Sequence, residues 1–450
     1  MQIIEESQFN RWWKDPAVSR IDPVTEGAVR TIIDAVRDRG DRALKDYAAQ
    51  FDRSSPDRLE VPPELPEAAW ESLCREEPEL AAALDLAASH IGGFAELQKR
   101  QLTDFETEIA GGLFTGQRVI PVERAAVYVP AGRFPLFSSV LMGMIPAFIA
   151  GVDGVILASP PMEGGLPHRH ILAAAWLSLQ RAAGSAPPGK RLRIFAMGGA
   201  QAIAALALGT ETVPRVNVIA GPGNKYVSAA KRILSGEVGI DLIAGPTDVL
   251  VIAGDSAGNA VERIAADMLA QAEHDPDARA RALVPHRGMA EEIVRALERQ
   301  LAALPRESRD SAGASLEAGG LIIIYESKKG ALRMANTIAP EHLELQVAGA
   351  EEWIGGLRNF GSLFIGDLAA EVLGDYSAGI NHTLPTLGSA RFTGGLSVRH
   401  FLKTPTTLRC LRAAGYEEAL RAAEIIGRAE GLAAHAGSAA IRREGRGDFP

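Results

Sequence analysis

Residues 216–225 read Val-Asn-Val-Ile-Ala-Gly-Pro-Gly-Asn-Lys, and this stretch decides the predicted fold class. A β-branched run, Val216–Ala220, ends in the glycine turn Gly221–Asn224, which leads into a helical segment. Such a turn lets backbone N–H groups meet a phosphate at the helix N-terminus. Tyr226 stands where a dinucleotide fingerprint would have its third glycine, so a nucleotide site and a plain tight turn both stay open. A second turn of this kind, Gly198–Gln201, also follows a predicted strand. Two glycine turns at the ends of strands favour a ligand site at that edge of the sheet.

The same succession of strand, turn and helix recurs through the middle of the chain. Short apolar runs are mostly bounded by Gly or Pro, and helical segments lie between many of them. Runs that are apolar throughout indicate strands buried on both faces, and therefore parallel sheets covered by helices. The other predicted strands are Ala125–Val129, Val152–Ala158, Leu192–Ala196, Val249–Ala253, Leu321–Tyr325 and Ser362–Gly366. The sequence therefore predicts an α/β protein.

The two ends of the chain have a different pattern. Residues 24–118 place apolar and charged positions at helical spacing and are predicted to be helical. After about Asn381 the chain is rich in turns, and it then ends with a predicted helix at Glu417–Ala434. We therefore expect a helical first quarter, an α/β middle and a short tail.

Composition excludes several classes of protein. The 450 residues are 47% hydrophobic and 23% charged, which is typical of globular chains and predicts two or three domains. The net charge of −9 argues against a nucleic-acid partner. The chain start lacks signal-peptide features, and no uncharged apolar stretch reaches the roughly 18 residues of a membrane span. Because the only cysteines, Cys74 and Cys410, cannot form a disulfide framework, we expect a soluble cytoplasmic protein.

The first polar group that could carry chemistry is Gln271-Ala272-Glu273-His274, at the end of a predicted helix. Residues three apart share a helix face, so Gln271 and His274 can converge on one point, whereas Glu273 points away. Both a metal site and a helix-terminal cation stabilised by the helix dipole are compatible with this pattern.

A second polar group is the adjacent pair Glu341-His342, which follows a proline. A carboxylate beside an imidazole is suited to acid–base chemistry, because His titrates near neutrality and Glu can activate a water. The pattern is equally typical of a helix that starts with Pro and Glu in its first turn.

Further polar residues lie toward the end of the chain. Asp375 and His382 belong to a glycine-rich stretch, where either a catalytic loop or a simple turn is expected. Glu430 and His435 lie near the end of the last predicted helix, where most such pairs are solvated. Scattered N and O donors with an open position would suit a catalytic zinc. The two cysteines lie away from the glycine turns, which disfavours a covalent thiol mechanism.

Taken together, these segments resemble the histidinol dehydrogenase family. The match keeps the order and spacing of the family motifs from about Ile120 to His435, whereas the first hundred residues match only loosely. The motifs are Val127–Pro130, Gly198–Ile203, Gly221–Asn224, Ala244–Pro246, Gln271–His274, Ala339–Glu344, Gly374–Tyr376, Asn381–Thr386 and Glu430–His435.

The resemblance implies roles for individual residues. One zinc per subunit would be held by Gln271, His274, Asp375 and His435, the last from the partner subunit of a homodimer with shared active sites. His342 would be the base that takes protons from the alcohol, and Glu341 would activate a water. NAD would contact Tyr128, Gln201 and Asn224. The substrate would contact Thr247, His382 and Glu430, together with His342 and the metal ligands.

The resemblance also implies a reaction and an architecture. The family oxidises the amino alcohol L-histidinol through its aldehyde to L-histidine with two NAD, in the last steps of histidine biosynthesis. The expected fold has two Rossmann-like parallel-sheet domains, a helical N-terminal segment and a small C-terminal dimerisation region. The expected parts are an N-terminal arm at 1–23, a first α/β domain at 24–118 and 247–378, an NAD-binding domain at 119–246 and the dimerisation region at 379–450.

Two departures from the family pattern leave the substrate open. The usual Pro-Gly-Gly is Pro130-Ala131-Gly132, and Thr247 replaces the usual serine of Ala-Gly-Pro-Ser-Glu, so a methyl group is added at a substrate position. The main alternative is a related enzyme that oxidises another small primary alcohol or diol, for example a sulfonated one. A binding protein without turnover and a hydrolase with zinc-bound water are disfavoured by the Glu341-His342 pair and by the two glycine turns.

Overall fold

The structure, a computed structural model, describes residues 1–13, 22–52, 58–131, 135–162, 164–182, 191–255 and 260–443. The chain forms two compact units, one from Met1–Gln98 and Val122–Phe401 and the other from Lys99–Pro121 and Leu402–Pro450. The first unit contains two separate parallel sheets. Within the described residues, no helix combines the length and the apolar character that crossing a membrane requires.

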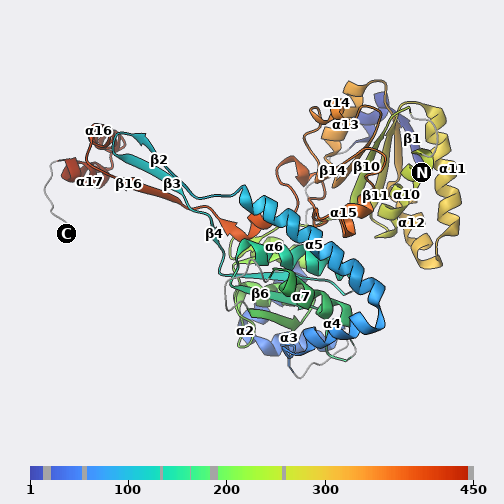
Figure 1. Cartoon of the computed structure of the whole chain (residues 1–450), viewed down its shortest axis with the longest axis horizontal. Helices are drawn as coiled ribbons and strands as arrows, with labels where there is room; N and C mark the ends of the chain where they lie inside the picture. The colour runs from blue at the N-terminus through green and yellow to red at the C-terminus, as the bar shows by residue number, and fades with distance from the viewer. Residues whose placement is uncertain are drawn as a thin grey trace. The chain divides into compact units, whose positions relative to one another are not determined.

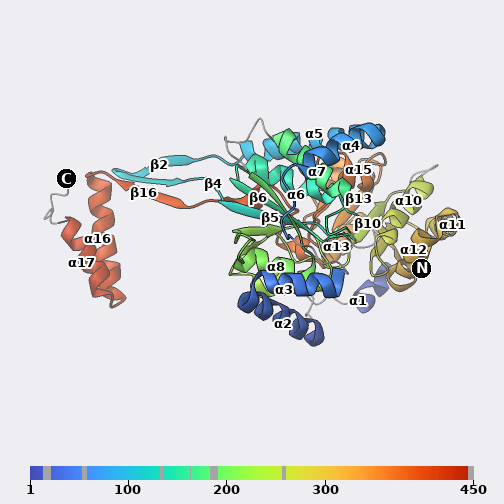
Figure 2. The ribbon, with the colours of Figure 1, turned by 90° about the horizontal axis from the view of Figure 1, so that it is seen from below.

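The first of these sheets has five parallel strands. They are β5 (Arg124–Tyr128), β6 (Gly154–Ser159), β7 (Arg191–Ala196), β8 (Val218–Ala220) and β9 (Gly239–Ile240). The spatial order is β7-β6-β5-β8-β9, so the winding reverses between β5 and β8. Helices cover both faces (Figure 2). One layer holds α2 (Pro23–Arg39), α8 (Gly199–Leu208) and α9 (Lys225–Leu234), and the other holds α4 (Leu65–Glu76), α6 (Ser138–Ala150) and α7 (Arg169–Ala182).

The N-terminal helix α2 belongs to the core of the five-stranded sheet. It begins at Pro23, where the Asp22 carboxylate accepts a hydrogen bond from the backbone N–H of Thr25 at 2.8 Å. Its apolar stripe is buried in the same cluster as residues of β5, α8 and α9. This packing differs from the expected boundaries, which grouped 24–118 with 247–378. An apolar stripe shows that a helix is buried, but it does not specify the sheet that buries it.

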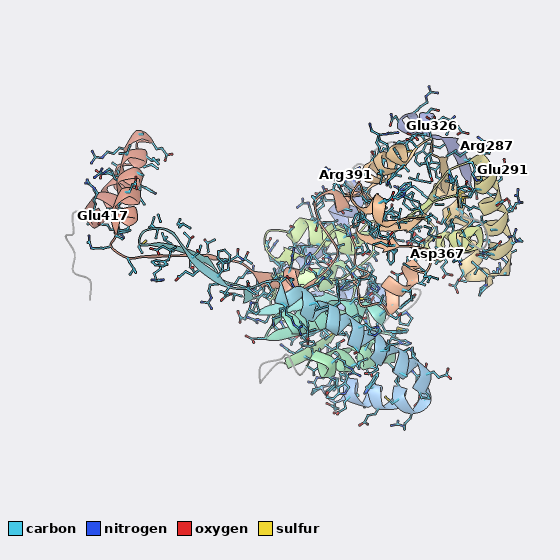
Figure 3. All side chains as sticks on the ribbon, turned by 45° about the horizontal axis from the view of Figure 1, so that its top comes forward. Arg287, Glu291, Glu326, Asp367, Arg391 and Glu417 are labelled. Atoms are coloured by element: carbon cyan, nitrogen blue, oxygen red, sulfur yellow. The ribbon has the colours of Figure 1, made fainter. Side chains whose placement is uncertain are left out.

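The second sheet of this unit has six parallel strands. They are β1 (Gln2–Glu5), β10 (Asp248–Ala253), β11 (Arg279–Val284), β12 (Leu321–Ile324), β13 (His342–Gln346) and β14 (Ser362–Ile365), in the spatial order β1-β12-β11-β10-β13-β14. One face is covered by α10 (Ala260–Glu273), α11 (Arg287–Ala303) and α12 (Arg306–Gly319), and the other by α1 (Phe9–Trp12) and α13 (Lys328–Ile338) (Figure 1). Charged side chains such as Arg287, Glu291 and Glu326 lie on the outside of this domain (Figure 3).

The two parallel sheets confirm the predicted α/β class, and every predicted strand is present. Four strands of the parallel sheets were missed, and one of them is the two-residue strand β9. β1 is an edge strand within the expected N-terminal arm, whereas β11 and β13 alternate apolar residues with Arg, His, Glu or Gln. β13 is fully buried all the same: the Glu344 carboxylate and the Gln346 amide nitrogen are hydrogen-bonded, whereas His342 Nε2 and Gln346 Oε1 have no partner among the described residues. Alternation of this kind normally indicates a half-exposed strand.

The other unit is built from antiparallel strands and two helices. The strands β2 (Phe105–Ala110), β3 (Leu113–Gln117) and β16 (Thr406–Cys410) form one sheet, β4 (Ile120–Pro121) pairs with β15 (Leu402–Lys403), and α16 (Ala414–Ala429) packs against α17 (Ala433–Arg443). The predicted helicity is therefore wrong for residues 105–117. Gly112, at φ +82°, makes the turn between β2 and β3, and Gly431, at φ +77°, divides the predicted last helix into two.

Candidate active site

A cavity of about 690 Å³ lies at the carboxyl edge of the five-stranded sheet, beside the strands between which the winding reverses. We call it the carboxyl-edge cavity. It is lined by Tyr128 at the end of β5, Gln201 in the first turn of α8 and Asn224 at the N-cap of α9. Tyr128 Oη accepts a hydrogen bond from the backbone N–H of Gly199 at 3.1 Å. Burial raises the pKa of Tyr128 to about 12, so its phenol is neutral near pH 7.

The glycine turn after β8 is held in place by a buried ion pair. Gly221 has φ +111°, and a Cβ there would lie 2.1 Å from the carbonyl oxygen of Tyr128, so only glycine fits. Lys231 Nζ donates to the carbonyl oxygen of Gly221 at 2.9 Å and to Asp241 Oδ1 at 2.5 Å. Asp241 Oδ2 accepts from the N–H of Gly221 at 2.8 Å. Both polar backbone groups of Gly221 are therefore fixed by one buried pair.

A second cavity, of about 360 Å³, lies at the amino edge of the six-stranded sheet, and we call it the amino-edge cavity. Thr247 directly precedes β10, Glu341 directly precedes β13, and His342 is the first residue of β13. The polar side chains that line the cavity include Thr247, His274, Glu341, His342, Asp375 and His382. Leu136, Phe137, Leu242 and Leu384 supply an apolar wall.

The position of Glu341 follows from the end of α13 and from its pairing with Asp248. Ala339 adopts a left-handed conformation, at φ +51°, and ends the helix before Pro340. The N–H of Glu341 donates to Asp248 Oδ1 at 3.2 Å, and the N–H of Asp248 donates to Glu341 Oε2 at 3.1 Å. Thr247 Oγ1 donates to the same carboxylate oxygen. Burial raises the pKa of Glu341 to about 7, against the opposing effects of His342 and Thr247.

His342 presents a ring nitrogen that the protein leaves without a partner. Its Nε2 is buried and accepts or donates no hydrogen bond among the described residues. Asp375 Oδ1 lies 3.4 Å from it, at the distance of an ion-pair contact. Burial alone would lower the pKa of His342, but the contact with Asp375 and the charges of Glu341 and Glu371 raise this pKa to about 10. A buried polar atom of this kind needs a ligand or a proton acceptor in the cavity.

Asp375 connects three histidines. His274 Nε2 lies 3.9 Å from Asp375 Oδ2, and His382 Nδ1 donates to the backbone carbonyl of Asp375 at 2.8 Å. The carbonyl can only accept, so His382 Nε2 carries no proton when neutral and accepts from Ser139 Oγ at 3.0 Å. Burial lowers the pKa of His382, which keeps its ring neutral. Burial would raise the pKa of Asp375, but its contact with His342 and the charges of the three histidines lower it.

Comparisons with known proteins extend over nearly the whole chain. A family model described as histidinol dehydrogenase matches residues 18–443. The chain is 44% identical over 423 residues to the histidinol dehydrogenase of Thermus thermophilus, which covers 94% of this chain and 95% of that protein. It is 44% identical over 420 residues to that of Geobacter sulfurreducens, with 93% of each covered. The chain belongs to the histidinol dehydrogenase family. A crystal structure of histidinol dehydrogenase from Elizabethkingia anophelis matches the fold with a TM-score of 0.87 at 33% identity, over 98% of this chain and 97% of that one.

Membership of the histidinol dehydrogenase family confirms the resemblance found in the sequence and makes the chain an oxidoreductase. Both cysteines are exposed and unpaired, and neither lines the two cavities. The structure therefore places no thiol where it could attack a substrate beside Glu341 and His342.

The residues that the histidinol dehydrogenase resemblance assigns to zinc do not all lie together. His274 and Asp375 line the amino-edge cavity, whereas Gln271 lies behind it. The side-chain amide of Gln271 lies 2.5 Å from Thr247 Oγ1. When the oxygen and nitrogen of this amide are exchanged, its nitrogen lies 3.2 Å from both carboxylate oxygens of Glu371. His435 and Glu430 lie exposed on the other unit. Among the described residues, no group of three His, Cys, Asp or Glu side chains could hold a metal ion.

A buried acidic cluster behind the site was missed from the sequence. Gln346 Nε2 donates to Asp267 Oδ2 at 3.0 Å and to Glu344 Oε2 at 2.6 Å, and the N–H of Glu371 donates to Glu344 Oε1 at 3.1 Å. Burial raises the pKa of all three acids, that of Glu344 to about 8. The only signal in the sequence was the alternation of polar and apolar residues in β13.

Proposed function

We propose that the chain oxidises L-histidinol to L-histidine through L-histidinaldehyde, with two NAD and one zinc ion per subunit. The observation that carries the proposal is the buried Glu341–His342 pair, which shares one cavity with Thr247, His274 and Asp375. The carboxyl-edge cavity, with Tyr128, Gln201 and Asn224, supports NAD binding beside it. A cytoplasmic location belongs to the proposal, because unpaired exposed cysteines suit a reducing compartment.

The side chains of the amino-edge cavity fit a zinc ion in their chemistry. His274 Nε2 and Asp375 Oδ2, which are 3.9 Å apart, would both hold the ion. The amide of Gln271 would supply an oxygen, and His435 of the partner subunit would supply a second imidazole. Nitrogen and oxygen donors of this kind suit zinc. When bound there, zinc would polarise the alcohol oxygen and, by engaging Asp375, oppose the protonation of His342.

His342 and Glu341 would each accept a different proton in the reaction. The free Nε2 of His342 would take the alcohol proton before hydride leaves the carbon for NAD. Glu341 would take a proton from a water that adds to the aldehyde, so that the hydrate can lose a second hydride. Thr247 and the N–H of Asp248 orient the Glu341 carboxylate for that step. No thiol adduct is needed, which agrees with the positions of both cysteines.

The decisive experiment supplies purified enzyme with histidinol and counts the NADH formed. The proposal expects about two NADH per histidinol consumed, and it expects histidinaldehyde to be oxidised when supplied alone. A panel of other small amino alcohols and diols, including a sulfonated diol, tests the effect of the extra methyl group of Thr247. Histidinol must give the highest kcat/KM of the panel, and a better substrate among the others would contradict the proposed substrate.

The zinc assignment is tested by His274→Ala. His274 is largely exposed, so its removal should leave the fold intact while the protein loses zinc and activity. Metal analysis and circular dichroism of the purified variant measure these two effects independently of turnover. Full zinc content in His274→Ala would contradict the assignment.

The shared site is tested by mixing two inactive variants, His435→Ala and His342→Ala. If His435 completes the neighbour's site, each mixed dimer has one intact active site and one site that carries both substitutions. Random reassociation makes about half of the dimers mixed, so about one quarter of wild-type activity returns. Each variant alone, taken through the same dissociation and reassociation, is the control. Mixed dimers without activity would contradict sharing.

A further inference from the structure

Asp52 is a carboxylate of the carboxyl-edge cavity to which neither the sequence motifs nor the proposed mechanism gives a role. It is the last residue of η2 (Ala48–Asp52) and lines the cavity together with Tyr128, Gln201 and Asn224. The neighbouring α3 (Asp41–Tyr47) packs against α8, whose first turn borders the same cavity. Asp52 therefore reaches the proposed cofactor site from the N-terminal helices, far from the motifs in sequence.

The carboxylate of Asp52 lacks a partner in the part of the chain that the structure describes. Its Oδ2 is enclosed and receives no hydrogen bond, and no Lys or Arg among the described residues forms an ion pair with it. Asp52 and Tyr128 line the same cavity, and burial raises the pKa of Asp52 to about 6. An enclosed carboxylate oxygen without a donor is unfavourable unless a ligand supplies one. The terminal torsion of Asp is soft, so either oxygen can turn toward such a ligand.

The arrangement of the cavities indicates which half of a dinucleotide would meet Asp52. A middle cavity of about 520 Å³ shares Asn224 with the carboxyl-edge cavity, and it shares Gly245 and Thr247 with the amino-edge cavity. The two outer cavities share no lining residue. The nicotinamide must reach the substrate beside Glu341 and His342, so the adenosine half is left for the cavity that contains Asp52.

We infer that Asp52 accepts hydrogen bonds from the ribose hydroxyls of the adenosine half and thereby selects NAD over NADP. The inference rests on the proposed NAD-dependent function and adds a specificity-determining residue to it. Two vicinal hydroxyls offer the donors that the carboxylate lacks. In NADP a phosphate replaces the 2′-hydroxyl, so one donor is lost and a dianion is brought against the half-buried carboxylate of Asp52.

The test compares kcat/KM for NAD and for NADP, at saturating histidinol, in wild type, Asp52→Asn and Asp52→Ser. Loss of a hydrogen bond to a charged group should lower kcat/KM for NAD by about tenfold to a hundredfold, with the KM for histidinol unchanged. The kcat/KM for NADP should stay the same or rise, because the repulsion is removed. Asp38→Asn, an exposed aspartate on α2, makes the same change of charge outside the cavity and should leave the ratio unchanged.

The NAD-to-NADP ratio separates recognition from general damage. A variant that is merely destabilised loses both activities alike, so a ratio within about twofold of wild type in both variants would overturn the inference. Equilibrium binding of NAD and NADP, measured by calorimetry on the same proteins, must show the same change in ratio. If wild type oxidises histidinol with neither cofactor, the proposed function itself has failed, whereas an unaltered ratio in an active NAD-dependent enzyme refutes only the role of Asp52.

Discussion

The two parallel sheets of the first unit are built alike but used at opposite edges. In the five-stranded sheet, Tyr128 ends β5 and Asn224 follows β8, so the cavity lies at the carboxyl edge, as is usual for open α/β sheets. In the six-stranded sheet, Thr247 precedes β10 and His342 begins β13, so the cavity lies at the amino edge. One sheet therefore presents strand ends to its cavity, and the other presents strand beginnings.

The difference matters because helix dipoles have opposite signs at the two edges. Helices that follow parallel strands begin at the carboxyl edge, so α8 and α9 direct the partial positive charge of their N-terminal ends toward the first cavity. The same geometry brings the end of α10, with Gln271 and His274, to the amino edge, where partial negative charge favours cations. We infer that one edge suits phosphates and the other suits a metal ion and proton transfer. Substitutions at the amino edge should then change kcat, and those at the carboxyl edge should change the KM for NAD.

The largest effect is expected for His342→Asn. Loss of the buried ring nitrogen Nε2, which has no partner among the described residues, should slow both oxidations by about 10²–10⁴-fold, because a proton must leave oxygen in each. Single-turnover NADH formation from histidinol and from histidinaldehyde measures the two steps. The KM for NAD should be unaltered, and a raised KM would show that the two edges are not separable.

Glu341→Gln should slow the aldehyde oxidation more than the alcohol oxidation. The amide keeps the size of the side chain but cannot take a proton from water, so aldehyde oxidation should fall by up to about 10²–10⁴-fold and alcohol oxidation by less. In wild type the aldehyde step should accelerate as the pH rises through about 7, because only the ionised form of Glu341 is a base and its pKa is about 7. This rise should be absent in the variant. Equal losses in both steps would leave Glu341 as an orienting residue only.

Lys231→Met tests the carboxyl edge. The change leaves Asp241 buried and unpaired, so the free energy of unfolding should fall by about 3–5 kcal/mol, and the loosened turn at Gly221 should raise the KM for NAD by about tenfold. The value of kcat at saturating NAD should change little. Lys329→Met, at an exposed position on α13, is the matched control. A fall in kcat alone would contradict the division between the edges.

The smallest effect is expected for Asn224→Ala. Asn224 Oδ1 caps α9 by accepting from the N–H groups of Tyr226 and Val227, and the loss of such a cap costs about 1 kcal/mol. Ser327→Ala removes the corresponding cap of α13 in the other domain and should lower stability by a similar amount. Urea unfolding compares the two. Only Asn224→Ala should also raise the KM for NAD, and equal KM values in both variants would count against a cofactor role for Asn224.

The parts of the site that were predictable from the sequence are those whose signals are local. An apolar run followed by a glycine turn specifies a strand end, so Gln201 and Asn224 could be expected at strand ends, whereas the assignment of Tyr128, Gln201 and Asn224 to one cofactor site came from the family resemblance. Glu341 and His342 could be selected as an acid–base pair, but the helix start that their proline also allowed is absent, because Ala339 ends α13 and a strand follows. Asp248, whose carboxylate holds the N–H of Glu341, lies 93 positions away and has no local signal.

By itself the sequence determined the class of fold, seven strands of the parallel sheets, the glycine turns and the family, since burial pattern, turn chemistry and motif order are written along the chain. Only the tertiary structure decided which sheet α2 covers, that the six-stranded sheet is used at its amino edge, and that Asp52 enters the cavity of Tyr128. These three facts depend on which buried surfaces meet. The apolar stripe of a helix is complementary to many sheets, and only the packing of the whole chain selects one.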